Sequence, residues 1–95
     1  MYGLIGQMQA VPGERARLMQ LLASSSEAMP GCLSYVIAAD KDDLDSIWIT
    51  EIWDSAESHK ASLEIPAVRE AITQARPLIA GFGTRAETEP LERTP

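Results

Sequence analysis

The chain has 95 residues and a formal net charge of −6, with 8 Lys and Arg against 14 Asp and Glu. This length makes one small domain with a thin core. Binding to nucleic acid or to an anionic membrane surface needs a positive patch, and the sequence contains no basic cluster, so both kinds of partner are disfavoured.

The single cysteine, Cys32, permits no internal disulfide, and one histidine with one cysteine cannot form a zinc or iron–sulfur site by themselves. The first residues lack a basic segment followed by an apolar run, so we expect no signal peptide. No apolar stretch approaches the roughly 20 residues of a membrane span. We therefore expect a soluble, cytoplasmic protein.

The first third of the chain predicts a strand and a helix. Residues 2–11 alternate between two faces, and Gly6 leaves a gap on one of them. Residues 12–14, with a proline and an early glutamate, favour a helix start. We expect this helix to continue through the serines at 24–26 to about Met29, before Pro30 and Gly31 end it.

The middle of the chain predicts an antiparallel pair of strands, residues 32–39 and 47–53, joined by the polar loop 40–45. Period two divides the second of these strands into two largely apolar faces, so we expect both to be covered. One face has Ile47, Ile49, Glu51 and Trp53, and the other has Trp48, Thr50 and Ile52.

A helix follows directly, with Asp54 as the expected N-cap and Glu57 as its capping-box partner. We expect it to end near Leu63. A further helix begins at Pro66 and closes at Pro77, and residues 81–87 predict a last strand. Residues 1–89 form the predicted single domain, and the polar residues 90–95 form a predicted flexible tail.

The order β-α-β-β-α-α-β predicts an α+β, ferredoxin-like fold with a four-stranded antiparallel sheet and helices on one face. The other face is left bare, with Trp48, Thr50 and Ile52 as candidates to lie on it. An exposed apolar sheet face usually marks an interface, so we expect a homodimer in which two sheets pack face to face.

Four short pieces of the sequence resemble the antibiotic biosynthesis monooxygenase family. They are PGCLSY at 30–35, WITEIWDS at 48–55, ASLEIPAV at 61–68 and RPLI at 76–79. Together they extend over nearly the whole chain in a fixed order. The resemblance implies a dimeric α+β barrel, and it is more specific for the fold than for an activity.

Members of the family that these residues resemble include cofactor-independent oxygenases of polyketide anthrones, quinol monooxygenases and heme-degrading monooxygenases. The heme-degrading members have an asparagine on the first strand and a heme-ligating histidine on the later helix. The asparagine position falls at Gly6 here, and the one histidine, His59, is in the preceding helix. We therefore expect no heme and no other cofactor.

Two residues are candidate catalytic groups. His59 could accept a substrate proton, because the ordinary pKa of imidazole lies near neutrality, or it could simply pack on its helix. Glu51 lies between Ile49 and Trp53 on a covered face, where the pKa of a carboxyl should be raised unless it is paired. Glu51 could act as a base, or form a structural ion pair with one of three arginines, which are Arg69, Arg76 and Arg85.

Three further residues are candidates for binding a substrate. Trp53 could form a wall for an aromatic ring, as the tryptophan that matches it does in the heme-degrading relatives, or be a core residue. Tyr35 could donate a hydrogen bond to a substrate oxygen, or be packed with its hydroxyl at the surface. Arg76 could stabilise an enolate-like oxygen, or be a solvated residue at a helix end.

Three functions remain open from the sequence. The first is a cofactor-independent monooxygenase that oxidises small phenolic, quinol or anthrone-type aromatic compounds with dioxygen, in an apolar pocket that keeps water out. The second is a non-catalytic or stress-related module that binds a small aromatic ligand. The third is a stable dimer whose pocket is filled by its own side chains.

Overall fold

The fold is seen in a computed structural model that describes residues 1–91. Four strands and three α-helices follow one another, and a short 3-10 helix precedes the last strand. The elements are, in order, β1 (Tyr2–Ala10), α1 (Arg15–Ser25), β2 (Cys32–Ala39), β3 (Ser46–Trp53), α2 (Ala56–Ser62), α3 (Pro66–Ala75), η1 (Arg76–Leu78) and β4 (Ile79–Thr88).

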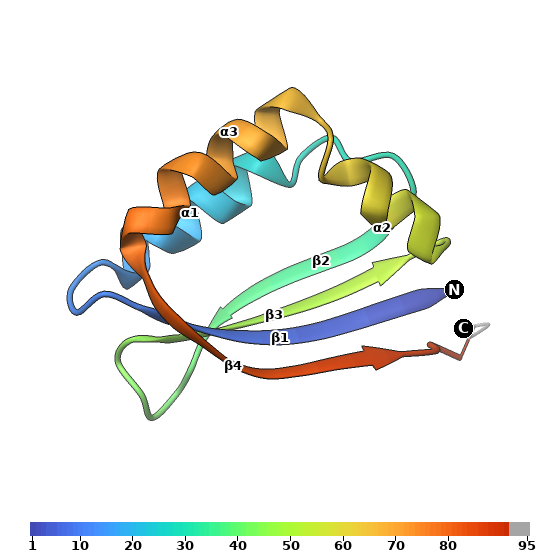
Figure 1. Cartoon of the computed structure of the whole chain (residues 1–95). Helices are drawn as coiled ribbons and strands as arrows, with labels where there is room; N and C mark the ends of the chain where they lie inside the picture. The colour runs from blue at the N-terminus through green and yellow to red at the C-terminus, as the bar shows by residue number, and fades with distance from the viewer. Residues whose placement is uncertain (92–95) are drawn as a thin grey trace.

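The strands form one antiparallel sheet in the order β2-β3-β1-β4, so that β1 lies inside the sheet and β4 at an edge. All three α-helices lie on the same side of the sheet. Helices α1 and α3 lie side by side along it, and α2 lies at the end where β3 finishes (Figure 1). The predicted ferredoxin-like order, with four antiparallel strands and helices on one face, is confirmed.

The core is built on β3. Ile47 and Trp53 are fully buried on its helix-facing side, and Ile49 is nearly so, whereas Thr50 on the opposite side is exposed. Leu18 of α1 is also fully buried and packs in one cluster with Ile47 and Ile49. The predicted division of this strand into two faces is therefore confirmed.

Helix α1 ends at Ser25 and does not reach Met29 as the sequence predicted. The hydroxyls of three consecutive serines donate to carbonyls three residues earlier: Ser24 to Leu21, Ser25 to Leu22 and Ser26 to Ala23. Such local bonds offer the backbone an alternative to helical pairing. The expectation that these serines do not break the helix was wrong.

The N-cap of α2 is Ser55 and not Asp54. The Ser55 hydroxyl oxygen accepts from the backbone N–H of Ser58 at 3.1 Å. The backbone N–H of Asp54 instead donates to the carbonyl of Gly31 at 2.9 Å, so this residue still belongs to the end of the sheet. The helix therefore begins one residue later than the predicted capping box requires.

The side of the sheet away from the helices has no covering element among residues 1–91 (Figure 1). Val36 on this face is 52% exposed, and Trp48 and Ile52 are half-buried. The indole N–H of Trp48 donates to Asp40 Oδ2 at 2.7 Å, which fixes the tryptophan against the β2–β3 loop. We call this surface the bare face.

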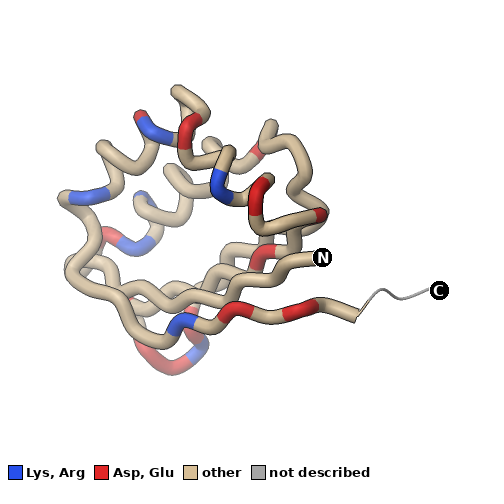
Figure 2. The backbone as a smooth tube through the Cα atoms, turned by 45° about the vertical axis from the view of Figure 1, so that its right-hand side comes forward, with Lys and Arg blue, Asp and Glu red and all other residues tan. Residues whose placement is uncertain are grey.

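Charged residues are interspersed over the molecule. Figure 2 shows Lys and Arg on the helices, the β2–β3 loop and β4, with acidic residues between them. The described helices include none that is both long and apolar enough to cross a membrane. Of the predicted tail, residues 92–95 lie outside the described part of the chain.

Candidate functional site

Strand β3 presents two predicted site residues to the helices, because residues two apart on a strand share a face. Trp53 lies between Tyr2 of β1 and Cys32 of β2, and Glu51 lies two pairs further along, between Leu4 and Tyr35. This end of the sheet lies under α2 (Figure 1). It combines a fully buried indole with a carboxyl group in an apolar setting.

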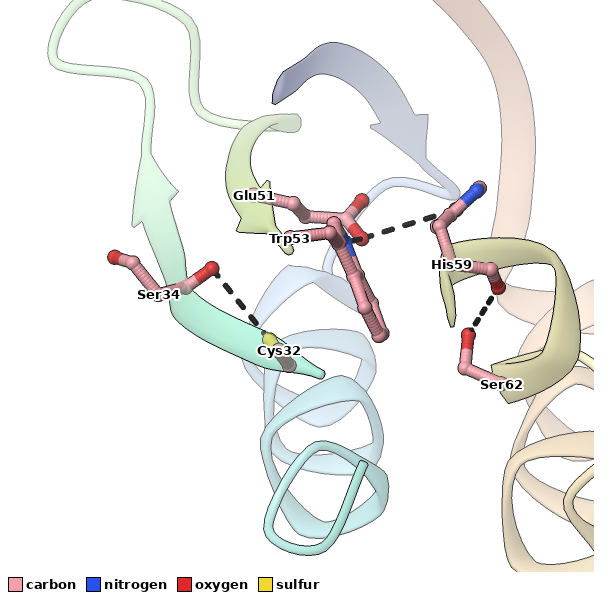
Figure 3. A network of polar contacts seen from close by, with 6 residues as sticks. All are labelled: Cys32, Ser34, Glu51, Trp53, His59 and Ser62. Atoms are coloured by element: carbon pink, nitrogen blue, oxygen red, sulfur yellow. Dashed lines mark hydrogen bonds and ion pairs between the residues drawn. The ribbon is translucent and has the colours of Figure 1, made fainter. Parts of the chain in front are cut away.

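Glu51, Trp53 and His59 form one connected group, which we call the Glu51 cluster. The indole N–H of Trp53 donates to Glu51 Oε1 at 3.0 Å, and His59 Nε2 lies 3.9 Å from the same oxygen (Figure 3). The His59 ring packs edge-on against Trp53, with centroids 5.4 Å apart, and lies 5.6 Å from the Tyr2 ring. The side chains of His59 and Glu51 are 19% and 12% exposed.

The turn before β2 helps to place His59. Gly31 has a φ of +84°, which L side chains rarely adopt, and a Cβ there would lie 2.6 Å from Ser58 Oγ and 2.7 Å from Asp54 Oδ1. The first turn of α2 thus packs on the bare backbone of Gly31. The Ser62 hydroxyl donates to the carbonyl of His59 at 2.6 Å and fixes the next turn.

Burial is the main influence on the acidity of Glu51, and it raises the pKa of this carboxyl above its ordinary value of 4.5. The hydrogen bond from Trp53 opposes the rise, as do the nearby side chains of His59 and Arg85. A carboxyl whose pKa is raised is a stronger general base than an ordinary one, because it holds the proton more strongly once accepted.

Two cavities meet at the cluster. The first, which we call the β4 cavity, has a volume of about 400 Å³ and an apolar wall of Leu4, Met8, Ile49 and Phe82, with Glu51 and Arg85 as its charged groups. The second, the α2 cavity, has about 380 Å³ and is lined by Tyr2, His59, Lys60, Leu63, Arg85 and Glu87. Both volumes fall within the roughly 300–1,000 Å³ of small-molecule sites.

The contact between Glu51 and His59 joins these cavities, since each residue lines one of them. Trp53 is fully buried and lines neither cavity, but its partner Glu51 lines the β4 cavity and its partner His59 lines the α2 cavity. The structure thus brings three predicted site residues together. A direct contact between Trp53 and a substrate ring stays a prediction.

Tyr35 lies beside Glu51 on the neighbouring strand and packs against the core. Burial and the charge of Glu51 raise the pKa of its phenol, so the hydroxyl stays protonated as a donor. Burial similarly raises the pKa of the Cys32 thiol. Arg76 lies at the opposite end of the sheet, in η1 next to the pairing of Ile79 with Ala10, and is not brought to the Glu51 cluster.

The three arginines offered as ion-pair partners of Glu51 lie elsewhere or pair differently. Arg69 lies 3.7 Å from Glu64, and Arg85 lies 3.1 Å from Glu87. The partner of Glu51 is His59, which sequence reasoning treated separately. Arg85 nevertheless lines both cavities, a role that sequence reasoning missed.

A β-bulge is the reason that Arg85 faces the cavities. Met8 pairs with Phe82 and Gly6 pairs with Arg85. Between these two pairs β4 has two residues, whereas β1 has one. Residues three apart would otherwise face opposite sides of the sheet, and a bulge re-aims one of them. Glycines at 81 and 83 were the available signal, since an isolated glycine in a strand suggests a bulge.

Residues 1–74 match the sequence profile of the family described as antibiotic biosynthesis monooxygenase. The chain belongs to this family. No curated protein shows a significant match. The profile match ends before β4, so the strand that carries Phe82 and Arg85 lies outside it.

Several solved structures have the same fold as this chain. A candidate member from Chloroflexus aurantiacus is 54% identical, with a TM-score of 0.95 over 99% of this chain and 96% of its own. A candidate member from Deinococcus radiodurans is 26% identical, with a TM-score of 0.80 over 100% and 97%. SnoaB from Streptomyces nogalater, a cofactor-independent oxygenase, is 14% identical, with a TM-score of 0.79 over 99% and 96%.

Proposed function

We propose that this member of the antibiotic biosynthesis monooxygenase family is a cofactor-independent oxygenase of small phenolic, quinol or anthrone-type aromatic compounds. One observation carries the proposal: a mostly buried carboxyl with a raised pKa, Glu51, at an apolar cavity of about 400 Å³. Such a cavity suits a flat aromatic ring, and the carboxylate suits the removal of a weakly acidic proton. Family membership supports a monooxygenase, and SnoaB offers a cofactor-independent precedent for the fold.

In the proposed reaction, Glu51 accepts a proton from the ring-activated position of the substrate. The resulting carbanion or phenolate passes one electron to dioxygen, and the substrate radical combines with superoxide to give a peroxide. For an anthrone, loss of water converts the original CH₂ group to C=O, so that substrate and O₂ give ketone and H₂O. The apolar wall of Leu4, Met8 and Ile49 limits the access of water to the intermediates.

His59 is the proposed proton relay. Its Nε2 lies 3.9 Å from the Glu51 oxygen that would receive the proton, and its ring lines the neighbouring α2 cavity. A proton on Glu51 can therefore leave by way of His59 without crossing the β4 cavity. The Trp53 N–H holds the same Glu51 oxygen and stabilises its charged form.

The proposal needs no resident cofactor. Heme iron is often held by a histidine nitrogen. The one histidine of the sequence, His59, packs against Trp53 and Tyr2, and its Nε2 is directed at Glu51. Among residues 1–91, no group of three His, Cys, Asp or Glu side chains is placed to hold a metal ion. The proposal assigns the chemistry to Glu51, His59 and the substrate.

We also propose that the protein is a homodimer that packs through the bare face. Val36, Trp48 and Ile52 give this face an apolar character that a partner sheet would cover. A small chain of 10.3 kDa has little core of its own, so covering the second face adds substantially to the area it buries.

Oxygen uptake by purified, chelator-treated protein tests the proposed activity. The substrates are a panel of anthrones, hydroquinones and catechols, and the controls are substrate alone and heat-denatured protein, since these compounds autoxidise. We expect uptake above both controls, a fall of about 100-fold or more in Glu51→Gln, and a smaller fall in Trp53→Phe and His59→Ala.

Glu64→Gln is the matched control, because it removes an equivalent carboxylate that is 78% exposed on the surface. Uptake that Glu51→Gln leaves unchanged would exclude the assigned base. Absence of uptake over the whole panel, together with thermal stabilisation by the same compounds, would favour a ligand-binding module over an oxygenase.

A further inference from the structure

Arg85 occupies a position that the proposed chemistry does not use. It lines both the β4 cavity and the α2 cavity, so its side chain forms part of the boundary between them. Among the described residues that line the β4 cavity, it is the one cation, and Glu51 is the one carboxylate. A positive group and a base thus share a small apolar cavity.

The guanidinium is held loosely. Arg85 contacts Glu87 Oε1 at 3.1 Å, but the two side chains are 60% and 58% exposed, and an exposed pair of this kind contributes little to stability. Glu87 is the next residue on the same face of β4. A ligand anion in the cavity can therefore replace Glu87 at small cost.

The space that a ligand needs in order to replace Glu87 lies opposite Arg85, on β1. Gly6 is the β1 partner of Arg85, and a Cβ built at Gly6 meets no atom within 4 Å. The side chain missing from Gly6 leaves the cavity open beside the arginine. A planar ligand can enter this gap and place an anionic oxygen against the guanidinium.

The bulge fixes the arginine in this orientation. Gln7 lies between the two pairs that flank the bulge, and its side-chain oxygen accepts from the backbone N–H of Thr84 at 3.3 Å. The amide of the same Gln7 donates to Ser46 Oγ of β3 at 2.8 Å. The bulge is thus tied to two neighbouring strands, and Arg85 faces the cavity because of it.

We propose that Arg85 binds an anionic oxygen of the substrate, so that the β4 cavity selects aromatic compounds that carry a carboxylate beside the ring to be oxidised. This inference rests on the proposed function, since it names the substrate class of the same cavity. Arginine suits the role because its planar fork binds a carboxylate through two parallel hydrogen bonds. Glu87 acts as the internal competitor that the substrate displaces.

Calorimetric binding of a matched pair of probes tests the proposal without any turnover. The probes are 6-hydroxy-2-naphthoate and 2-naphthol, which share the ring system and hydroxyl and differ in the carboxylate. We expect the wild-type protein to bind the naphthoate about tenfold or more tightly than the naphthol, as one charge-assisted contact predicts.

Three variants sharpen the result. Arg85→Gln should lose about tenfold in affinity for the naphthoate and leave the naphthol nearly unchanged. Glu87→Gln should bind the naphthoate up to about fivefold more tightly, because the competing carboxylate is removed. Arg69→Gln is the control, because Arg69 of α3 makes a similar exposed pair with Glu64. This variant should bind both probes as the wild type does.

Any of three results would overturn the proposal. They are an equal loss of affinity for both probes in Arg85→Gln, an unchanged affinity for the naphthoate in that variant, and no binding of the naphthoate by the wild type at millimolar concentration. Thermal melting of each variant shows whether it folds, and Arg85→Lys should restore part of the affinity. Oxygen uptake by the wild type that is as fast on uncharged anthrones as on anthrones that carry a carboxylate would leave the oxygenase intact and refute the selection of acids.

Discussion

The carboxyl group of Glu51 lies in a mostly buried setting that disfavours its charged form. Burial raises its pKa above the ordinary value of 4.5, so the folded protein still holds a proton that the unfolded chain has already released. Between about pH 4.5 and the raised pKa, the folded state binds more protons than the unfolded state. The free energy of unfolding therefore falls as the pH rises through this window.

Glu51→Gln removes this contribution, so the stability of the variant relative to wild type should rise as the pH increases from about 4.5 through the raised pKa of Glu51. Urea denaturation of both proteins across that range measures the difference. Glu64→Gln, which removes an exposed charge, controls for the change in net charge. Parallel curves for wild type and Glu51→Gln would contradict the assignment of a buried, disfavoured charge.

Sequence reasoning at the residue scale found the reactive group but not its partners. Glu51 and Trp53 stood out because their spacing places them on one strand face, which is a local property. The contact with His59 depends on where α2 lies, and that depends on Gly31 and on the Ser55 cap. The position of Arg85 in the cavities was missed because a bulge changes the side of the sheet that Arg85 faces, and strict alternation does not predict this change.

At the scale of elements, the start of α2 is positioned by the glycine turn before β2. Gly31→Ala would force a side chain into a positive φ and against Asp54 and Ser58. Gly13 has the same φ of +84°, but a Cβ there meets nothing within 4 Å. An alanine at Gly13 would therefore cause backbone strain alone, whereas an alanine at Gly31 would cause both backbone strain and a steric clash.

We expect Gly13→Ala to lower the free energy of unfolding by about 1–2 kcal/mol, and Gly31→Ala to cost about 1–3 kcal/mol more. Because α2 carries His59, Gly31→Ala should also reduce oxygen uptake, whereas Gly13→Ala should not. Chemical denaturation and uptake assays on both variants measure these effects. Equal losses of stability would show that the packing of α2 on Gly31 is unimportant.

The order and type of the elements followed from the sequence because the periodic patterns are strong. The strand at 32–39 matches β2 throughout, and the helix that begins at Pro66 starts where predicted. Errors fell at the ends. Three serines that bond to their own helix stopped α1 early, and β4 begins at Ile79, before the predicted residue 81, because Ile79 pairs with Ala10.

At the scale of the whole molecule, the bare face predicts self-association. Light scattering of the purified protein at micromolar concentration should give twice the mass of the 10.3 kDa chain. Val36→Asp places a charge on the exposed centre of β2 and should yield the single-chain mass, because packing through the bare face would bury this charge without a partner. Leu44→Asp, in the loop between β2 and β3 where Leu44 is 82% exposed, is the control and should stay dimeric.

The bulge on β4 also bears on how relatives of different length should be aligned. Loss of Thr84 would return β4 to regular pairing, with Phe82 still opposite Met8 and Arg85 still opposite Gly6. A homologue one residue shorter at this point would keep the same cavity wall. An alignment gap there is therefore neutral for the site, whereas forcing an ungapped alignment would place the wrong side chain in the cavity.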